Sequence, residues 1–135
     1  MKQILVDAAY FIALANPNDQ WHERSVQRAA ETANHDLVTT EDVLIELLNF
    51  YAESGDFMRR KVGELTRSIL LDSRINIVGR TETTLLDALD LYESRLDKGY
   101  SLTDCISMNV CKKLGIEDVL TTDKHFQQEG FNVLL

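Results

Sequence analysis

The sequence has no apolar run long enough to cross a membrane, and it is poor in proline, cysteine and basic residues. No apolar stretch approaches the roughly 20 residues of a transmembrane helix. One proline in 135 residues, with 44% hydrophobic and 27% charged residues, argues against a disordered chain. We therefore expect one soluble, cytoplasmic domain, residues 1–135, with a single substantial core.

The two cysteines, Cys105 and Cys111, fit neither a disulfide nor a zinc site. They lie six residues apart in one predicted helix, which separates them by about 9 Å of rise, too far for a disulfide. No histidine stands at zinc-like spacing from them. We expect both thiols to be buried as small apolar groups.

Basic residues are outnumbered, with 14 Lys and Arg against 22 Asp and Glu and a net charge of −8. General binding to nucleic acid draws on basic surface and counterion release, so this charge does not favour it. An acidic protein that acts on phosphodiesters needs divalent metal ions or a local basic patch, and a basic protein partner is another use of the surplus charge. The densest basic group is Arg59, Arg60, Lys61 and Arg67, which is either an RNA backbone track or a solvated helix face.

Short apolar runs typical of β-strands alternate with helical patterns along the whole chain. Strands are expected at 4–6, 37–39, 75–78, 119–122 and 131–135. Helices are expected at 10–14, 20–34, 41–53, 56–72, 81–97 and from about 104 to 114, where Gly115 ends the last of them. No two strands are joined tightly enough for a clear hairpin. The pattern therefore predicts an α/β fold, a parallel sheet with helices on both faces.

Four acids are expected at the edge of this sheet where the parallel strands end. Asp7 closes the first strand, Glu46 lies two turns into the helix after the second strand, Asp104 lies in the first turn of a helix, and Asp123 follows the fourth strand. Clustered carboxylates repel one another unless cations are present, and Mg²⁺ or Mn²⁺ prefers such oxygen ligands. The alternative is that each acid is a cap or a solvated charge, since Asp104 would complement a helix dipole in any case.

Three segments resemble the PIN-domain family, especially VapC-like toxins of toxin–antitoxin pairs: ILVDAAYFIAL, VTTEDVLIELLNF and YSLTDCISMNVCKKLGIEDVLTTDKHF. The resemblance implies a three-layer α/β/α sandwich with about five parallel strands. It also implies an endoribonuclease that depends on Mg²⁺ or Mn²⁺, with RNA as substrate, a homodimer and a cognate antitoxin protein as partner.

Carried onto this sequence, the resemblance makes Asp7, Glu46, Asp104 and Asp123 the catalytic, metal-binding acids. Asp7 and Asp104 would be the principal ligands, Glu46 would bind directly or through water, and Asp123 would hold a second metal or its waters. Thr121 or Thr122 could steady the site by hydrogen bonds. His125 is interpreted as part of a turn anchored by its neighbour Phe126, and not as catalytic.

One departure from the family pattern follows Asp7. The family usually has a small hydroxyl residue there and then Ser or Asn, whereas this chain has Ala8 and Ala9. Two polar groups that would support the metal site are therefore missing. The alternative function is a catalytically weak PIN-fold module that acts by binding a protein or RNA partner.

Overall fold

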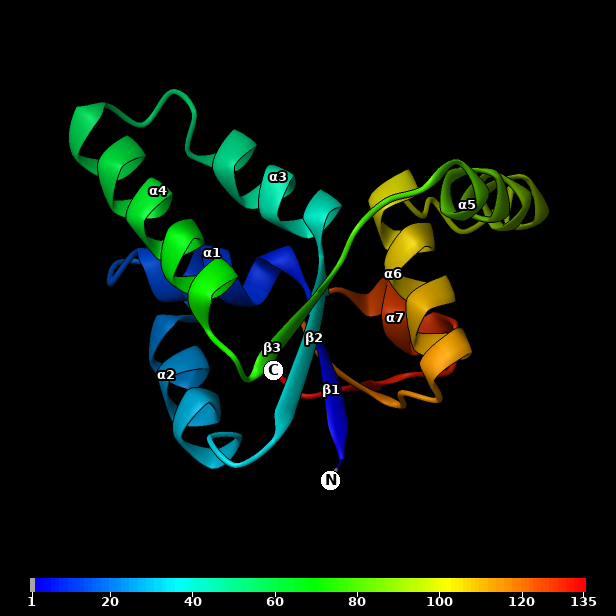
Figure 1. Ribbon diagram of the computed structural model, residues 1–135, viewed down its shortest axis with the longest axis horizontal. Coiled ribbons are helices and arrows are strands. Elements are labelled where there is room, and N and C mark those ends of the chain that lie inside the picture. Colours follow the sequence, from blue (N-terminus) through cyan, green and yellow to red (C-terminus); the bar gives the residue numbers. More distant parts are fainter. Residues whose placement is uncertain (1) are drawn as a thin grey trace.

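The computed structural model describes residues 2–135, in which a central sheet lies between two layers of helices (Figure 1). The sheet has five strands in the order β3-β2-β1-β4-β5, and every neighbouring pair is parallel. The strands are β1 (Gln3–Val6), β2 (Asp36–Thr40), β3 (Ile75–Val78), β4 (Asp118–Leu120) and β5 (Asn132–Val133). The predicted three-layer α/β class is confirmed.

The helices form two groups, one on each side of the sheet (Figure 1). The first group is α1 (Ala8–Ala15), α2 (His22–Glu31), α3 (Glu41–Phe50) and α4 (Asp56–Leu71). The second is α5 (Glu82–Ser94), α6 (Leu102–Leu114) and α7 (Lys124–Gln128). Side chains of β1 alternate between the two faces, so Ile4 and Val6 join the apolar cluster under the first group and Leu5 joins the cluster under the second.

Several predicted helix ends are confirmed by their hydrogen bonds. The hydroxyl oxygen of Thr40 accepts from the backbone N–H of Val43 at the start of α3. Thr81 begins α5 with a reciprocal capping box. Gly115 ends α6 with a φ of 71°, a left-handed conformation that glycine adopts without steric cost.

Two helices leave some of their apolar residues exposed. In α2, which is shorter than the predicted 20–34, Ser25 is buried while Val26 is 49% exposed. In α4, Phe57 is 75% exposed and Leu70 is 56% exposed, whereas Ile69 is buried together with Val62 and Thr66. Helical periodicity identifies an apolar stripe but not whether another layer covers all of it, so the exposure of these residues could not be read from the sequence.

The last part of the chain also differs from the prediction. The fourth strand ends at Leu120 and not at Thr122, and the residues after Asp123 form the short helix α7 instead of a turn. Cys105 and Cys111 are free and fully buried, as predicted. Within residues 2–135, no helix is long and apolar enough to span a membrane.

Candidate active site

Asp7 lies at the carboxyl end of β1, in the middle of the sheet. Its backbone N–H donates to the carbonyl of Leu120 (3.1 Å), which continues the pairing of β1 with β4 past the end of the strand. The side chain is almost fully enclosed, with 5% of the residue exposed. Its Oδ2 accepts a hydrogen bond of 2.7 Å from the hydroxyl of Thr121, the residue after β4. The pairing of β1 with β4 therefore places Asp7 and Thr121 side by side.

Asp104 is held at the start of α6 by a capping box with Ser101. The Ser101 hydroxyl oxygen accepts from the backbone N–H of Asp104 (3.0 Å), and Oδ2 of Asp104 accepts from the backbone N–H of Ser101 (3.2 Å). The residue is only 6% exposed. Because both bonds are local, the sequence from 101 to 104 is enough to orient this carboxylate.

Asp123 reaches the same edge through Thr121 and α7. Its backbone N–H donates to the Thr121 hydroxyl oxygen (3.0 Å), and its own Oδ1 accepts from the backbone N–H of His125 (2.9 Å), which caps α7. One hydroxyl group therefore connects the loop of Asp123 to the side chain of Asp7. Thr121, one of two threonines predicted to steady the site, has this role in the structure.

Glu46 is the most accessible of the four acids, one turn beyond Asp42 on α3. Partial burial of its carboxyl raises the pKa of Glu46, and the charges of Asp104 and Asp123 raise it further. These effects require the carboxyl of Glu46 to lie near both aspartates. On α3, Glu46 lies between the exposed Ile45 and the buried Leu47, which accounts for this mixed environment.

The four acids influence one another's protonation. Burial, followed by the charges of Asp104 and Glu46, raises the pKa of Asp7 to about 7, although the Thr121 hydrogen bond opposes the shift. Burial is also the main reason that the pKa of Asp104 is raised, and the charge of Asp123 adds to it. The structure therefore brings the four predicted acids into one electrostatic group. A cation among them would relieve both the repulsion and the burial of charge.

His125, interpreted from the sequence as part of a turn, also lies beside these acids. Its Nδ1 lies 3.2 Å from Oδ2 of Asp104 and 3.3 Å from Oδ1 of Asp123. Ligand atoms of these three residues all lie within 4.8 Å of one another. The signal in the sequence was the Asp-x-His spacing, because a residue two positions after a helix cap can fold back over the capping side chain.

The chemistry of this donor set fits a divalent metal ion. Carboxylate oxygens are the ligands that Mg²⁺ and Mn²⁺ prefer, and an imidazole nitrogen is compatible with Mn²⁺. The carboxylates of Asp7 and Asp104 are nearly excluded from water. A bound ion would therefore provide the stabilisation of their charge that water does not provide. The arrangement can thus hold a cation, and the site is open to solvent on the side of Glu46.

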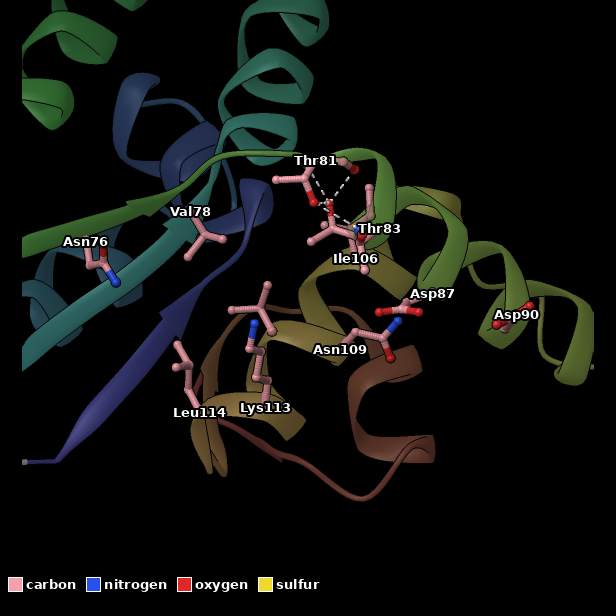
Figure 2. Close-up of a pocket in the computed structure, with 12 residues that line it drawn as sticks. Asn76, Val78, Thr81, Thr83, Asp87, Asp90, Ile106, Asn109, Lys113 and Leu114 are labelled. Carbon is pink, nitrogen blue, oxygen red and sulfur yellow. Dashed lines mark hydrogen bonds between the residues drawn. The ribbon is translucent and has the colours of Figure 1, made fainter.

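A separate pocket of about 590 Å³ lies between β3, α5 and α6 (Figure 2). Asn76 and Val78 of β3 face it from one side, and Asp87 of α5 and Asn109 of α6 from the other. None of the four predicted acids lines this pocket. The pocket is therefore not an extension of the acidic site.

The sequence profile of the PIN domain matches residues 4–132. The chain belongs to the PIN domain family. Nucleases with this domain use divalent metal ions, in agreement with the donor set at the strand ends.

Individual PIN domains resemble the chain over most of its length. A VapC ribonuclease of Aquifex aeolicus (strain VF5) is 28% identical over 98 residues, which cover 73% of this chain and 69% of that protein. The crystal structure of VapC20 from Mycobacterium tuberculosis, described as a toxin that cleaves the sarcin–ricin loop, has a TM-score of 0.82, 25% identity and 95% coverage of both chains. DNA-bound VapBC from Salmonella typhimurium shares the fold, with a TM-score of 0.67 and 14% identity. The match covers 98% of this chain and 97% of that chain.

Proposed function

We propose that this PIN domain protein is an endoribonuclease that hydrolyses RNA phosphodiester bonds at a site holding Mg²⁺ or Mn²⁺. The observation that carries the proposal is the convergence of Asp7, Glu46, Asp104 and Asp123 at one sheet edge, with three of their pKa values raised. Membership of the PIN domain family and similarity to VapC ribonucleases confirm the ribonuclease class expected from the sequence.

Within the site, the four acids have different roles because their environments differ. Asp7 and Asp104, which are buried and oriented by Thr121 and Ser101, would be the principal ligands. Glu46, which is exposed, would bind directly or through water and would lie on the side where RNA enters. Asp123 would hold a second ion or its waters. A divalent ion held here supplies activation of a water molecule and stabilisation of charge on the phosphate oxygens.

We further propose that the protein is the toxin of a toxin–antitoxin pair and forms a homodimer. Support comes from the VapC relative and from the structural similarity to VapC20, described as a toxin, and to DNA-bound VapBC. Light scattering on the purified protein measures its mass against that of the 15.4 kDa chain. Co-purification with the product of a small open reading frame directly upstream tests for the antitoxin.

The alternative, a catalytically weak PIN-fold module that binds a partner, is favoured by Ala8 and Ala9. Neither side chain can supply the hydroxyl groups that the family usually places after the first acid. In this chain the hydroxyl of Thr121, which follows the neighbouring strand β4, donates a hydrogen bond to Asp7. A hydrogen bond from the backbone N–H of Ala8 also lowers the pKa of Asp7. These two contacts favour the enzyme over the inert module.

An RNA cleavage assay with Mg²⁺ or Mn²⁺ separates the two functions. Wild-type protein should cleave RNA, and Asp7→Asn and Asp104→Asn should each abolish cleavage. Asp36→Asn is the matched control, because Asp36 is exposed at the amino end of β2, the opposite edge of the sheet. If the wild type is inert, the binding module is favoured. If both variants are as active as the wild type, the site assignment is wrong.

The substrate should be compared in the same assay. A hairpin RNA with the sarcin–ricin sequence is one substrate, because VapC20 is described as cleaving that loop. An unstructured RNA and a DNA strand of the same sequence are the other two. Cleavage of DNA at the rate of RNA would contradict the ribonuclease assignment.

A further inference from the structure

We infer that His125 is a nitrogen ligand of this metal site and that it makes the site favour Mn²⁺ over Mg²⁺ more than the carboxylates alone would. The inference rests on the proposed function, since it concerns the metal of the same site. It adds a ligand of a different chemical type to the four acids and thereby determines which ion the protein selects.

The positions of three donor atoms carry the inference. Two ligands at right angles on an octahedral ion, each about 2.1 to 2.2 Å from it, are about 3.0 to 3.1 Å apart. Nδ1 of His125 is 3.2 Å from Oδ2 of Asp104 and 3.3 Å from Oδ1 of Asp123. Two of the three distances are therefore within a few tenths of an ångström of the value for adjacent ligands, and ligand atoms of all three residues lie within 4.8 Å of one another.

The ring of His125 is held in this orientation by contacts on its other sides. Its backbone N–H donates to Oδ1 of Asp123 (2.9 Å), which fixes the start of α7. The ring packs against Tyr100, with centroids 5.3 Å apart and planes at 57°. Nε2 lies beside Gly99, where an added Cβ would be 3.9 Å away. Because Nε2 lies against Gly99, Nδ1 is directed at the carboxylates of Asp104 and Asp123.

Tyr100 is itself anchored. It is 5% exposed, and its hydroxyl donates to Oε1 of Glu129 (3.0 Å). Glu129 also accepts from Arg95 and Lys112, which belong to different parts of the chain. The ring of His125 therefore packs on a residue that is fixed before any ion binds, and this lowers the entropy cost of using it as a ligand.

The simpler explanation is that His125 only donates a hydrogen bond to one of the carboxylates. A bound ion would then be surrounded by oxygen atoms alone, and the ring would turn away. The two explanations differ in the atoms bonded to the metal. They also differ in metal selectivity, because imidazole nitrogen is a softer ligand that favours a transition-metal ion such as Mn²⁺ over Mg²⁺, whereas carboxylates and waters suit both ions.

The test is electron spin echo spectroscopy of the full chain loaded with Mn²⁺, without RNA, after labelling with [¹⁵N]histidine. Nuclear coupling from a directly bonded histidine nitrogen is expected in the wild type and should be lost in His125→Asn, whose amide keeps a polar group near the position of Nδ1. The chain has three histidines, and His35→Asn is the control, because His35 immediately precedes β2 at the opposite edge. The coupling should persist in that control.

Calorimetry on the same proteins measures selectivity. His125→Asn should lower the affinity for Mn²⁺ about tenfold or more, with a much smaller change for Mg²⁺. Equal thermal unfolding of the two variants shows that the fold is intact.

The possible failures are distinguishable. If Mn²⁺ binds and RNA is cleaved but no histidine coupling appears, the inference about His125 is overturned and the proposed function stands. The inference is likewise overturned if the coupling survives in His125→Asn. If neither ion binds and RNA is not cleaved, the proposed function fails, and the inference fails with it.

Discussion

The hydroxyl of Thr121 donates to Oδ2 of Asp7 at 2.7 Å, across 114 positions of sequence. The hydroxyl oxygen of Thr121 also accepts a hydrogen bond of 3.0 Å from the backbone N–H of Asp123. Two acids from distant parts of the chain thus depend on one fully buried side chain. Since the residues after Asp7 are both alanine, Thr121 is the side chain that donates to Asp7 in this protein.

Thr121→Val should impair the site while preserving its shape. The hydrogen bond from Thr121 lowers the pKa of Asp7, so its removal should raise that pKa above about 7. Less of the carboxylate is then ionised at neutral pH, and cleavage should fall about tenfold or more. The acid limb of the pH–rate profile should move to higher pH. Thr122→Val is the control, and an unchanged profile for Thr121→Val would show that this contact is dispensable.

The stability of the metal-free protein should decrease as pH rises from about 4 to about 8. In the folded protein the pKa of Asp7 is raised from 3.8 to about 7, so in this range the folded state holds a proton that the unfolded state has lost. The contribution of Asp7 to stability is therefore fully present below pH 3.8 and is lost as the pH rises through the folded pKa of about 7. The full effect is on the order of 4 kcal/mol. Asp7→Asn should remove most of it.

Thermal unfolding in the presence of a chelator measures this effect. At pH 8 the Asp7→Asn variant should unfold at a higher temperature than the wild type, and the difference should shrink at pH 5. Asp36→Asn should follow the wild type at both values. A wild type that is more stable at pH 8 than at pH 5 would refute the electrostatic account of the site.

Adding Mn²⁺ should have the opposite pH dependence. Metal ions bind deprotonated carboxylates, so the increase in melting temperature should be larger at pH 8 than at pH 5. Asp104→Asn should abolish most of the increase, because it removes a buried ligand. Equal increases in this variant and in the wild type would place the ion elsewhere on the protein.

Much of the site could be predicted because its parts are local. An apolar run that ends in an acid places Asp7 at the sheet edge, and the Ser101–Asp104 capping box requires only four consecutive residues. The alternation of strands and helices predicted parallel pairing, whereas the pairing of β1 with β4 in particular came from the structure. The sequence predicted that either Thr121 or Thr122 forms hydrogen bonds at the site. It did not distinguish the two, because the end of the strand was uncertain by one residue.

The Asp-x-His spacing places His125 beside Asp123, but the orientation of its ring could not be predicted, because it depends on contacts between distant segments. Its ring is oriented by Tyr100, which lies 25 positions earlier. The hydroxyl of Tyr100 in turn donates a hydrogen bond to Glu129, just after the end of α7. No periodic pattern indicates such a network. The exposed Phe57 is a related case, since its pattern suggested burial but the fold provides no layer to cover it.

Glu129→Gln should destabilise the protein by about 2 kcal/mol at pH 7. Burial alone would raise the pKa of Glu129, but hydrogen bonds from Arg95, Lys112 and Tyr100 lower it to about 2. This stabilisation is present above the unfolded pKa near 4.5 and is lost as the pH falls towards 2. Urea unfolding should show the difference at pH 7 and a smaller one at pH 3. The exposed Glu117→Gln should change stability by less than about 0.5 kcal/mol. Equal effects of the two substitutions would mean that the network around Glu129 contributes nothing beyond a surface charge.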